Sequence, residues 1–284
     1  MNHTRRYILT IACPDRVGII AAVGSFIAQH KGWIVEASYH TDLESQRFFM
    51  RQEIRADSLP FDAAEFRHRF APLAQEFGMD WQLTDAGQKK RLVVLVSKQD
   101  HCLNDLLHRW RSGELQVDIP CVISNHEDLR SFVEWHGIPY FHVDFSDKSA
   151  AFEKITALFE QYRGETMVLA RFMQIMPQHL CARYSGRIIN IHHSFLPSFV
   201  GAKPYHQAYL RGVKLIGATC HYVTGELDAG PIIEQDPMRI DHGDTVDDLV
   251  RYGRDIEKTV LARGLRYHVE DRVLVCGNKT IVFR

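Results

Sequence analysis

The sequence predicts an α/β protein with an N-terminal ferredoxin-like βαββαβ domain and a second, Rossmann-like domain with a mostly parallel sheet. The first observation is the order strand, helix, strand, strand, helix, strand up to residue 85. The second is the repeated alternation of one strand with one helix from residue 91 onward, which is typical of an open parallel sheet. The polar stretch DAGQKKR separates the two patterns. We therefore predict domains at 1–84 and 92–284, with a linker at 85–91.

Apolar spacing and turn residues define the elements of the first domain. The run RYILTIAC is typical of a strand and is ended by PDRVG, and the helical spacing that follows stops at Gly32. Phenylalanines at helical spacing, from Phe61 to Phe77, predict the core face of a second helix. We predict strands at 6–13, 33–42, 46–55 and 79–85, and helices at 18–32 and 61–78.

The second domain begins with RLVVLVS, a continuous apolar run of the kind found in a parallel strand that is covered on both faces. Strands and helices then alternate. We predict strands at 91–97, 117–125, 139–145, 166–170, 187–192, 215–224 and 231–240, and helices at 101–113, 127–137, 148–163, 177–184 and 245–269.

Composition excludes several classes of partner. Thirty-four Lys and Arg balance 35 Asp and Glu, so we expect neither nucleic acid nor an acidic membrane surface as a partner. No apolar run approaches the roughly 20 residues of a membrane helix, and the N-terminus does not resemble a signal peptide. The six cysteines are scattered without a C-x-x-C pair, which is typical of reduced thiols in a cytoplasmic protein.

The stretch INIHHSFLP carries the strongest candidate site. Asn190 and His192 are two residues apart, so they share one face of the predicted strand, which ends in a Pro-stiffened loop. Such a pair is also compatible with satisfied polar groups at a sheet edge. However, active sites of parallel sheets lie beyond the carboxyl ends of strands. Asp228 lies in a Gly-containing turn between two later strands, from which its carboxylate can reach the imidazole.

An amide, an imidazole and a carboxylate together suit acyl transfer. The amide and the imidazolium can stabilise an oxyanion, and the carboxylate can collect a proton. The sequence contains no G-x-S-x-G nucleophile elbow. Direct attack on the substrate by an amine or by water is therefore favoured over a covalent acyl-enzyme.

At these two motifs, NIHHSFLPSFVGAKPYHQA and HYVTGELDAGPII, the chain resembles the folate-dependent formyltransferase family, and the resemblance extends in layout over residues 90–284. It implies that Asn190, His192 and Asp228 are catalytic. It also implies that RFMQIM lines the pterin pocket, and His221 is a further candidate for substrate contact. The expected substrate-binding residues are Arg171, Phe172, Met173, Gln174, Ile175, Met176 and His221.

Two departures favour the formyltetrahydrofolate deformylase branch of that family. The position of the glycine-rich acceptor-phosphate loop reads VSKQDHCLNDLL, where Asp100 and Asp105 would repel a phosphate. The form HHSFLP also resembles the deformylases. This resemblance implies hydrolysis of 10-formyltetrahydrofolate to formate and tetrahydrofolate by water, with a place in one-carbon metabolism and purine biosynthesis. The alternatives are a transferase with an unidentified amine acceptor and a regulatory binding protein without turnover.

The first domain resembles an ACT domain, a module that binds small amino acids and usually pairs. This implies a homo-oligomer and an effector such as glycine or methionine, held where free backbone N–H groups open the first helix. The PDRVG loop is equally compatible with an ordinary strand-to-helix turn. The expected effector-binding residues are Asp15, Arg16, Val17, Gly18 and Ile19.

We expect no metal site, because no H-E-x-x-H motif and no Cys/Asp partner set accompanies His192, His193, His206 and His221, the histidines that could lie near one another. No cofactor is expected either, since the folate derivative is the substrate. Lys203 and Arg211 are candidates for contact with the folate glutamate tail, but a solvated surface position is favoured for both.

Overall fold

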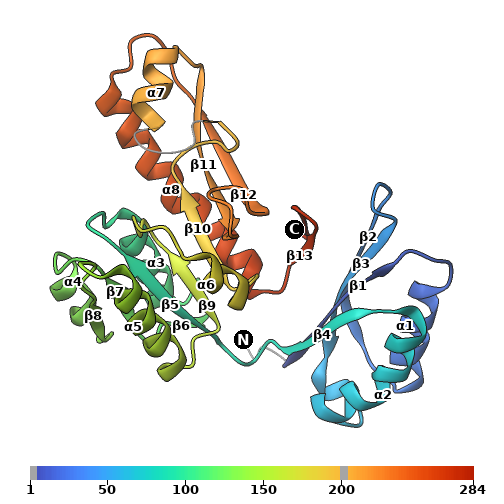
Figure 1. Cartoon of the computed structure of the whole chain (residues 1–284). Coiled ribbons are helices and arrows are strands. Elements are labelled where there is room, and N and C mark those ends of the chain that lie inside the picture. Colours follow the sequence, from blue (N-terminus) through green and yellow to red (C-terminus); the bar gives the residue numbers. More distant parts are fainter. Residues whose placement is uncertain (1–4, 199–203) are drawn as a thin grey trace. The chain divides into compact units, whose positions relative to one another are not determined.

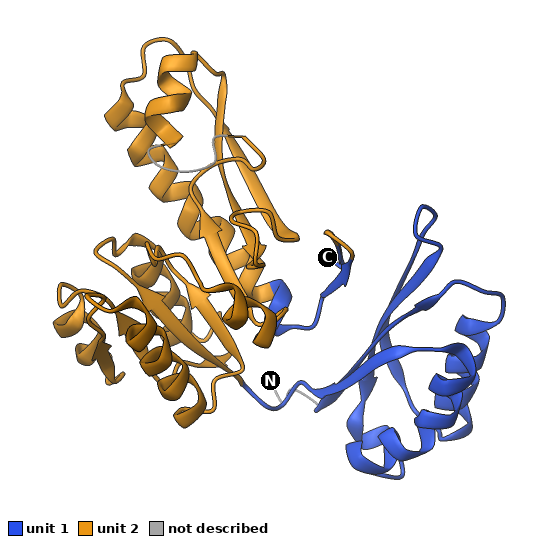
Figure 2. Cartoon of the chain, in the orientation of Figure 1, with its two compact units in different colours: residues 1–89, 267–276, 280–284 blue, residues 90–266, 277–279 orange. Residues whose placement is uncertain are grey.

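A computed structural model describes residues 5–198 and 204–284 (Figure 1). The chain divides into two compact units, coloured separately in Figure 2. Unit 1 comprises residues 1–89, 267–276 and 280–284, and unit 2 comprises residues 90–266 and 277–279. This division differs from the predicted boundaries of 1–84, 85–91 and 92–284 because C-terminal residues join the first unit. Among the described helices, none has the length and apolar character needed to cross a membrane.

Unit 1 contains the predicted order of elements, and its sheet is antiparallel with the strand order β2-β3-β1-β4. Asp62 caps the second helix by accepting from the N–H groups of Ala64 and Glu65, and Gly78 ends it in a left-handed conformation. The elements are β1 (Arg6–Pro14), α1 (Ile19–Gln29), β2 (Ile34–Asp42), β3 (Arg47–Arg55), a short 3₁₀ helix (Ala56–Ser58), α2 (Ala63–Phe77) and β4 (Asp80–Asp85).

The alternation of side chains along β3 places apolar groups on both faces of this sheet. Met50 and Ile54 belong to a core that includes Phe66 and Phe70 of α2. Phe49 faces the opposite side, where it packs with residues of the C-terminal hairpin formed by β13 (Val273–Cys276) and β14 (Lys279–Val282). This second core is why C-terminal residues belong to unit 1. Its buried members are Phe49, Leu274, Cys276 and Phe283.

Unit 2 is built on a mostly parallel sheet, as predicted. Five strands in the order β10-β9-β5-β7-β8 are parallel, while β11 and β12 extend the sheet antiparallel beyond β10. The elements are β5 (Lys90–Val96), α3 (His101–Ser112), β6 (Val117–Asp118), β7 (Val122–Ser124), α4 (Arg130–Trp135), β8 (Tyr140–His142), α5 (Lys148–Gln161), β9 (Thr166–Leu169), α6 (Gln178–Arg183), β10 (Ile188–His192), α7 (Pro204–Arg211), β11 (Leu215–Tyr222), β12 (Ile232–Arg239) and α8 (Val246–Val269).

The order of the parallel strands reverses between β5 and β9. After β5 the chain builds β7 and β8 on one side, and it then returns to place β9 and β10 on the other. In open α/β sheets such a switch point opens a crevice at the carboxyl ends of the strands, where ligands bind. The loops after β5 and β9 are therefore positioned to form a binding site.

Three features of unit 2 and the C-terminus differ from the sequence-based predictions. The strand predicted at 117–125 is two short strands with Pro120 between them, because proline cannot donate to a sheet. Helix α7 was not predicted, although Pro204 opens it and Gly212 follows it. The hairpin β13–β14 was also missed, with Gly277 in a left-handed conformation at its turn.

Candidate active site

A cavity of about 570 Å³ lies in unit 2 at the carboxyl ends of β5, β9 and β10. Its size is typical of a small-molecule site. The sequence-predicted catalytic and substrate-binding residues all line it. Its lining comprises Gln99, Leu169, Arg171–Met176, Asn190–His193, Pro204–His206, His221, Val223–Asp228, Val250, Arg254 and Glu257.

The last strand of the parallel block supplies Asn190 and His192. In β10, Asn190 is level with Leu169, the final residue of β9, and it is paired with His221 of β11. His192 is the last residue of the strand and is buried. The predicted sharing of one face brings both polar side chains to the cavity, whereas the buried Ile188 and Ile189 of β10 are not part of its lining.

Asp228 reaches the same point from the turn between β11 and β12. Its φ of +53° is in the left-handed region, which Asp tolerates better than most residues. Gly230 allows this turn, since a Cβ there would lie 1.8 Å from the Tyr222 carbonyl oxygen. Asp228 Oδ1 lies 3.3 Å from His192 Nδ1. Burial favours a higher pKa for Asp228, but the hydrogen bond and charge of His192 outweigh it and lower the pKa.

His221 holds the Asn190 amide in a defined orientation. His221 Nδ1 is 2.9 Å from the Tyr222 carbonyl oxygen, which only accepts, so Nδ1 carries a proton. Burial lowers the pKa of His221, which leaves the ring neutral and Nε2 without a proton. The Asn190 amide, 3.2 Å away, therefore donates one N–H to His221 Nε2. Its second N–H remains for a substrate oxygen.

The imidazole of His192 has one occupied and one unoccupied nitrogen. Nδ1 faces Asp228, whereas Nε2 is buried and has no hydrogen-bond partner among the described residues. A buried polar atom without a partner is costly in a folded protein unless a ligand or water satisfies it. The neighbouring His193 is neutral, since burial first and Arg171 second lower its pKa to about 3. His192 is thus the member of the His-His pair that is poised for chemistry.

Residues 171–176 form one wall of the cavity, at the switch point of the sheet. Arg171 and Met176 are buried, but Met173 and Ile175 expose apolar side chains. The Met173 N–H donates to Ser97 Oγ at 3.0 Å, which fixes the segment to the end of β5. An exposed apolar wall of this kind suits a flat ring system.

Glu257 and Tyr205 also line the cavity, and neither was predicted from the sequence. Glu257 lies on the buried face of α8 with Leu249, Ile256 and Val260, and it accepts from Tyr205 Oη at 2.7 Å. A carboxylate at an apolar position of a helical repeat was the available signal.

The predicted effector loop is in unit 1. Asp15, Arg16, Val17 and Gly18 are exposed, whereas the Ile19 side chain belongs to the core, so only its backbone is available. Gly18 has a φ of +98° and precedes α1, whose first turn has no side-chain cap. Arg16 donates to the Glu76 carbonyl oxygen at 2.9 Å. In unit 2, Arg211 is exposed as expected, and Lys203 lies outside the described residues.

Comparison with known proteins gives a consistent result. The family model described as Formyl transferase matches residues 90–265. A curated protein of Corynebacterium sp. (strain P-1), named formyltetrahydrofolate deformylase, is 46% identical, with 100% of each chain covered. The crystal structure of a formyltetrahydrofolate deformylase from Pseudomonas syringae pv. tomato str. DC3000 is 63% identical, with a TM-score of 0.98, over 100% of this chain and 96% of that one.

A more distant structure matches only part of this chain. Phosphoribosylglycinamide formyltransferase from Anaplasma phagocytophilum is 32% identical, with a TM-score of 0.64, and it covers 69% of this chain and 96% of its own. Such a transferase thus lacks a counterpart for about a third of this chain, whereas the deformylases match it over its full length.

Proposed function

This chain belongs to the formyl transferase family, and from that membership we propose that it is a formyltetrahydrofolate deformylase, a hydrolase that converts 10-formyltetrahydrofolate to formate and tetrahydrofolate. One observation carries the choice of activity. Curated proteins named formyltetrahydrofolate deformylase match the chain from end to end, with 46% identity over 100% of both chains in one case.

The geometry supports a mechanism in which water attacks the formyl carbon directly. The pterin lies against residues 171–176 and the formyl oxygen meets the unoccupied Nε2 of His192 and the free N–H of Asn190. Because ionised Asp228 only accepts hydrogen bonds, Nδ1 of His192 carries a proton, and Nε2 donates when the ring is an imidazolium. These two donors stabilise the oxyanion as it forms.

Asp228 has two roles in this mechanism. Its lowered pKa keeps it ionised, so it stabilises the His192 imidazolium and accepts the proton that water loses on attack, directly or through a relay. The tetrahedral intermediate then collapses, the bond between the formyl carbon and N10 breaks, and N10 takes up a proton. The products are formate and tetrahydrofolate.

A transferase with an amine acceptor is the second candidate, since it would use the same trio. The loop after β5 speaks against it, because it presents Gln99 to the cavity rather than a run of glycine N–H groups. Asp100 and Asp105, which the sequence suggested would repel a phosphate, are not among the cavity-lining residues. Asp105 accepts from Arg109 at 2.7 Å and Asp100 accepts from Asn104 at 3.0 Å, so the missing glycines, and not these carboxylates, speak against a transferase.

For unit 1 we propose an ACT domain, a ferredoxin-like module that binds a small amino acid such as glycine or methionine and pairs chains into a homo-oligomer. The uncapped first turn of α1 after the exposed residues 15–18 supports a carboxylate site there. Titration calorimetry of the full chain with glycine and with methionine tests this. Six free, buried cysteines support a cytoplasmic location, where released formate would serve purine biosynthesis.

The test of the activity is to mix the purified chain with 10-formyltetrahydrofolate alone and to measure formate and tetrahydrofolate. We expect turnover without any acceptor, and its loss in Asp228→Asn. Turnover only after an amine is added would show a transferase instead. Tight folate binding without turnover under either condition would identify a regulatory binding protein.

A further inference from the structure

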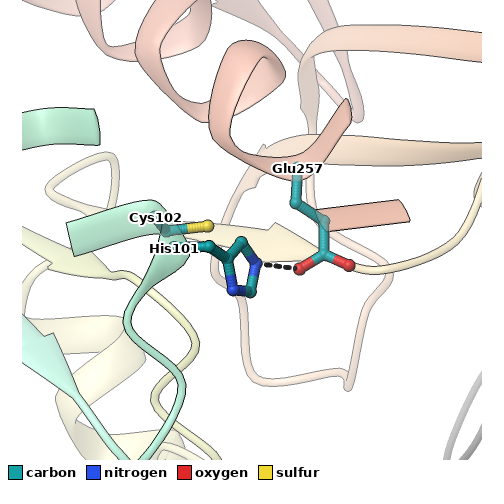
Figure 3. A group of neighbouring side chains, drawn as sticks. All are labelled: His101, Cys102 and Glu257. Atoms are coloured by element: carbon teal, nitrogen blue, oxygen red, sulfur yellow. Dashed lines mark hydrogen bonds and ion pairs between the residues drawn. The ribbon is translucent and has the colours of Figure 1, made fainter. Parts of the chain in front are cut away.

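Three potential metal ligands meet in unit 2 and have no part in the mechanism above. His101 and Cys102 open helix α3, directly after the loop that follows β5, and Glu257 lies 156 residues from His101, in α8. One donor atom from each residue lies within 4.8 Å of the others (Figure 3). No metal site was expected from the sequence, because Glu257 is far along the chain from the adjacent His101 and Cys102 and only the fold brings it to them.

We propose that His101, Cys102 and Glu257 bind one divalent transition-metal ion, such as Zn²⁺ or Fe²⁺, which holds the water that attacks the formyl group. Imidazole nitrogen, thiolate sulfur and carboxylate oxygen are the donors that such ions prefer. Three protein ligands leave one tetrahedral position open, as in catalytic metal sites. The role of the water rests on the proposed function, but the binding of the ion does not.

The distances require only small movements to hold an ion. His101 Nε2 and Glu257 Oε2 are 2.8 Å apart, with a proton between them (Figure 3). Metal bonds of about 2.0–2.2 Å in a tetrahedron place two such ligands roughly 3.3 Å apart, so the ion replaces the proton after a shift of about 0.5 Å. A bond of about 2.3 Å to Cys102 Sγ requires the thiol to approach by at most roughly 1 Å.

Neighbouring side chains already orient the Glu257 carboxylate. Tyr205 Oη donates to Oε1 at 2.7 Å, and Arg171 Nε lies 3.4 Å from Oε2. Gly253 makes room for the phenol, since a Cβ there would lie 2.1 Å from Tyr205 Oη. Hydrogen bonds from outside the ligand shell fix ligating carboxylates in this way. The thiolate and the carboxylate balance the two charges of the ion, and Arg171 then offsets the charge of a bound hydroxide.

One of the three proposed ligands faces the cavity in which the reaction takes place. Glu257 lines the same cavity as Asn190, His192 and Asp228. A bound divalent ion lowers the pKa of its water toward about 7. The water gives one proton to Asp228, its oxygen bonds to the formyl carbon, and the oxyanion rests on Asn190 and His192. When the bond from carbon to N10 breaks, N10 takes the proton, and no oxidant or reductant is needed.

The first experiment measures metal in the full chain, purified without an affinity tag and washed with a weak chelator. Elemental analysis by mass spectrometry should find about one Zn or Fe ion per chain. Substitution of a residue that only supports a metal ligand lowers metal affinity ~10–100-fold. We therefore expect a loss of metal affinity at least this large in each of the ligand variants Cys102→Ser, His101→Gln and Glu257→Gln. Cys121→Ser, which changes another fully buried thiol, should keep it.

The second experiment links the ion to the reaction. A strong chelator should abolish hydrolysis of 10-formyltetrahydrofolate, and added Zn²⁺ or Fe²⁺ should restore it. The Co²⁺-substituted chain should show a thiolate-to-cobalt charge-transfer band that Cys102→Ser lacks.

The possible contrary results distinguish failure of the metal site, of the catalytic role of the ion and of the proposed function. Full hydrolysis by metal-free protein overturns the role of the ion and leaves the deformylase function intact. A stoichiometry near zero, or metal retained by all three ligand variants, overturns the site itself. Metal bound through these residues without hydrolysis under any condition contradicts the proposed function and supports the site.

Discussion

Two buried polar clusters, one in each unit, differ in how completely their hydrogen-bonding groups are paired. In unit 1, Arg51 is 1% exposed, and all three of its guanidinium nitrogens donate. Its partners include Glu53, Glu36 and the carbonyl oxygens of residues 270 and 271. In unit 2, His192 is nearly as buried, but its Nε2 has no partner among the described residues.

This difference distinguishes a structural cluster from a reactive one. We call the group around Arg51 and Glu53 the closed cluster, and the group of Asn190, His192 and Asp228 the open site. In the Arg51 cluster, two carboxylates and two backbone carbonyl oxygens surround one cation, so each guanidinium nitrogen has an acceptor. Within the part of the chain that the structure describes, the site of unit 2 leaves one imidazole nitrogen and one amide N–H without a partner, and both residues line a cavity. Burial alone does not indicate function, whereas burial with an unpaired donor at a cavity does.

The largest effect is expected from a substitution that removes the charge of Asp228 from the open site. Asp228→Asn keeps the shape but cannot stabilise the His192 imidazolium or accept a proton from water. We expect kcat for hydrolysis to fall about 10²–10⁴-fold, measured by release of formate. Asp144→Asn, at an exposed position of unit 2, should keep the wild-type rate. A near-normal rate in Asp228→Asn would remove Asp228 from the mechanism.

A substitution in the closed cluster should lower the stability of unit 1 and leave the rate of hydrolysis unchanged. Arg51→Met leaves Glu53 buried without its main partner, which costs about 3–5 kcal/mol for a broken buried pair. Faster amide hydrogen exchange of peptides from β1 and β3 should report this loss of stability. At a low temperature, where the variant stays folded, kcat should be unchanged. The matched control is Arg55→Met, which breaks a solvent-exposed pair with Asp57 and should leave the stability of the sheet nearly unchanged. Equal losses in the two variants would contradict the assignment.

A smaller effect should follow from disturbing His221, which positions the Asn190 amide. His221→Leu removes the acceptor, so Asn190 loses its alignment, and we expect kcat to fall about 10–10²-fold with little change in KM. His221→Gln retains an acceptor oxygen and should recover part of the rate. If the Leu variant turned over as fast as wild type, the amide would need no such support.

Much of the open site was predictable from sequence, because local rules determine it. The i, i+2 spacing of Asn190 and His192, the end of a parallel strand and the turn at Asp228 place three groups together without knowledge of packing. The meeting of His101, Cys102 and Glu257 was not predictable in this way. It depends on how α8 packs against the start of α3, which no local pattern specifies.

The closed cluster escaped prediction for the same reason. Arg51 and Glu53 lie in β3 as an ordinary alternation of charged residues, which by itself indicates a solvated face. The C-terminal segment after α8 covers that face with Leu274 and Phe283, and the carbonyl oxygens of residues 270 and 271, just before β13, accept from Arg51. Only the structure shows that this face is buried.

The smallest expected effect is a pH dependence of stability in the closed cluster. Burial favours a higher pKa for Glu53, but hydrogen bonds from Arg51 and Arg6 outweigh it and lower the pKa. The unfolded chain therefore takes up the proton first as the pH falls. The contribution of Glu53 is complete above its ordinary pKa of about 4.5 and is lost as the pH falls through the folded value.

Glu53→Gln tests this dependence, because it removes the titrating group and keeps an oxygen acceptor for Arg51. Hydrogen exchange of β3 should show wild type more stable than the variant at neutral pH, with the difference shrinking below about pH 4.5. Glu65→Gln, which breaks an exposed pair with Arg69, should show no such convergence. A stability difference that stayed constant down to acid pH would mean that the Arg51 cluster does not depend on the charge of Glu53. Hydrogen-bond geometry, and not the charge of Glu53, would then stabilise the closed cluster.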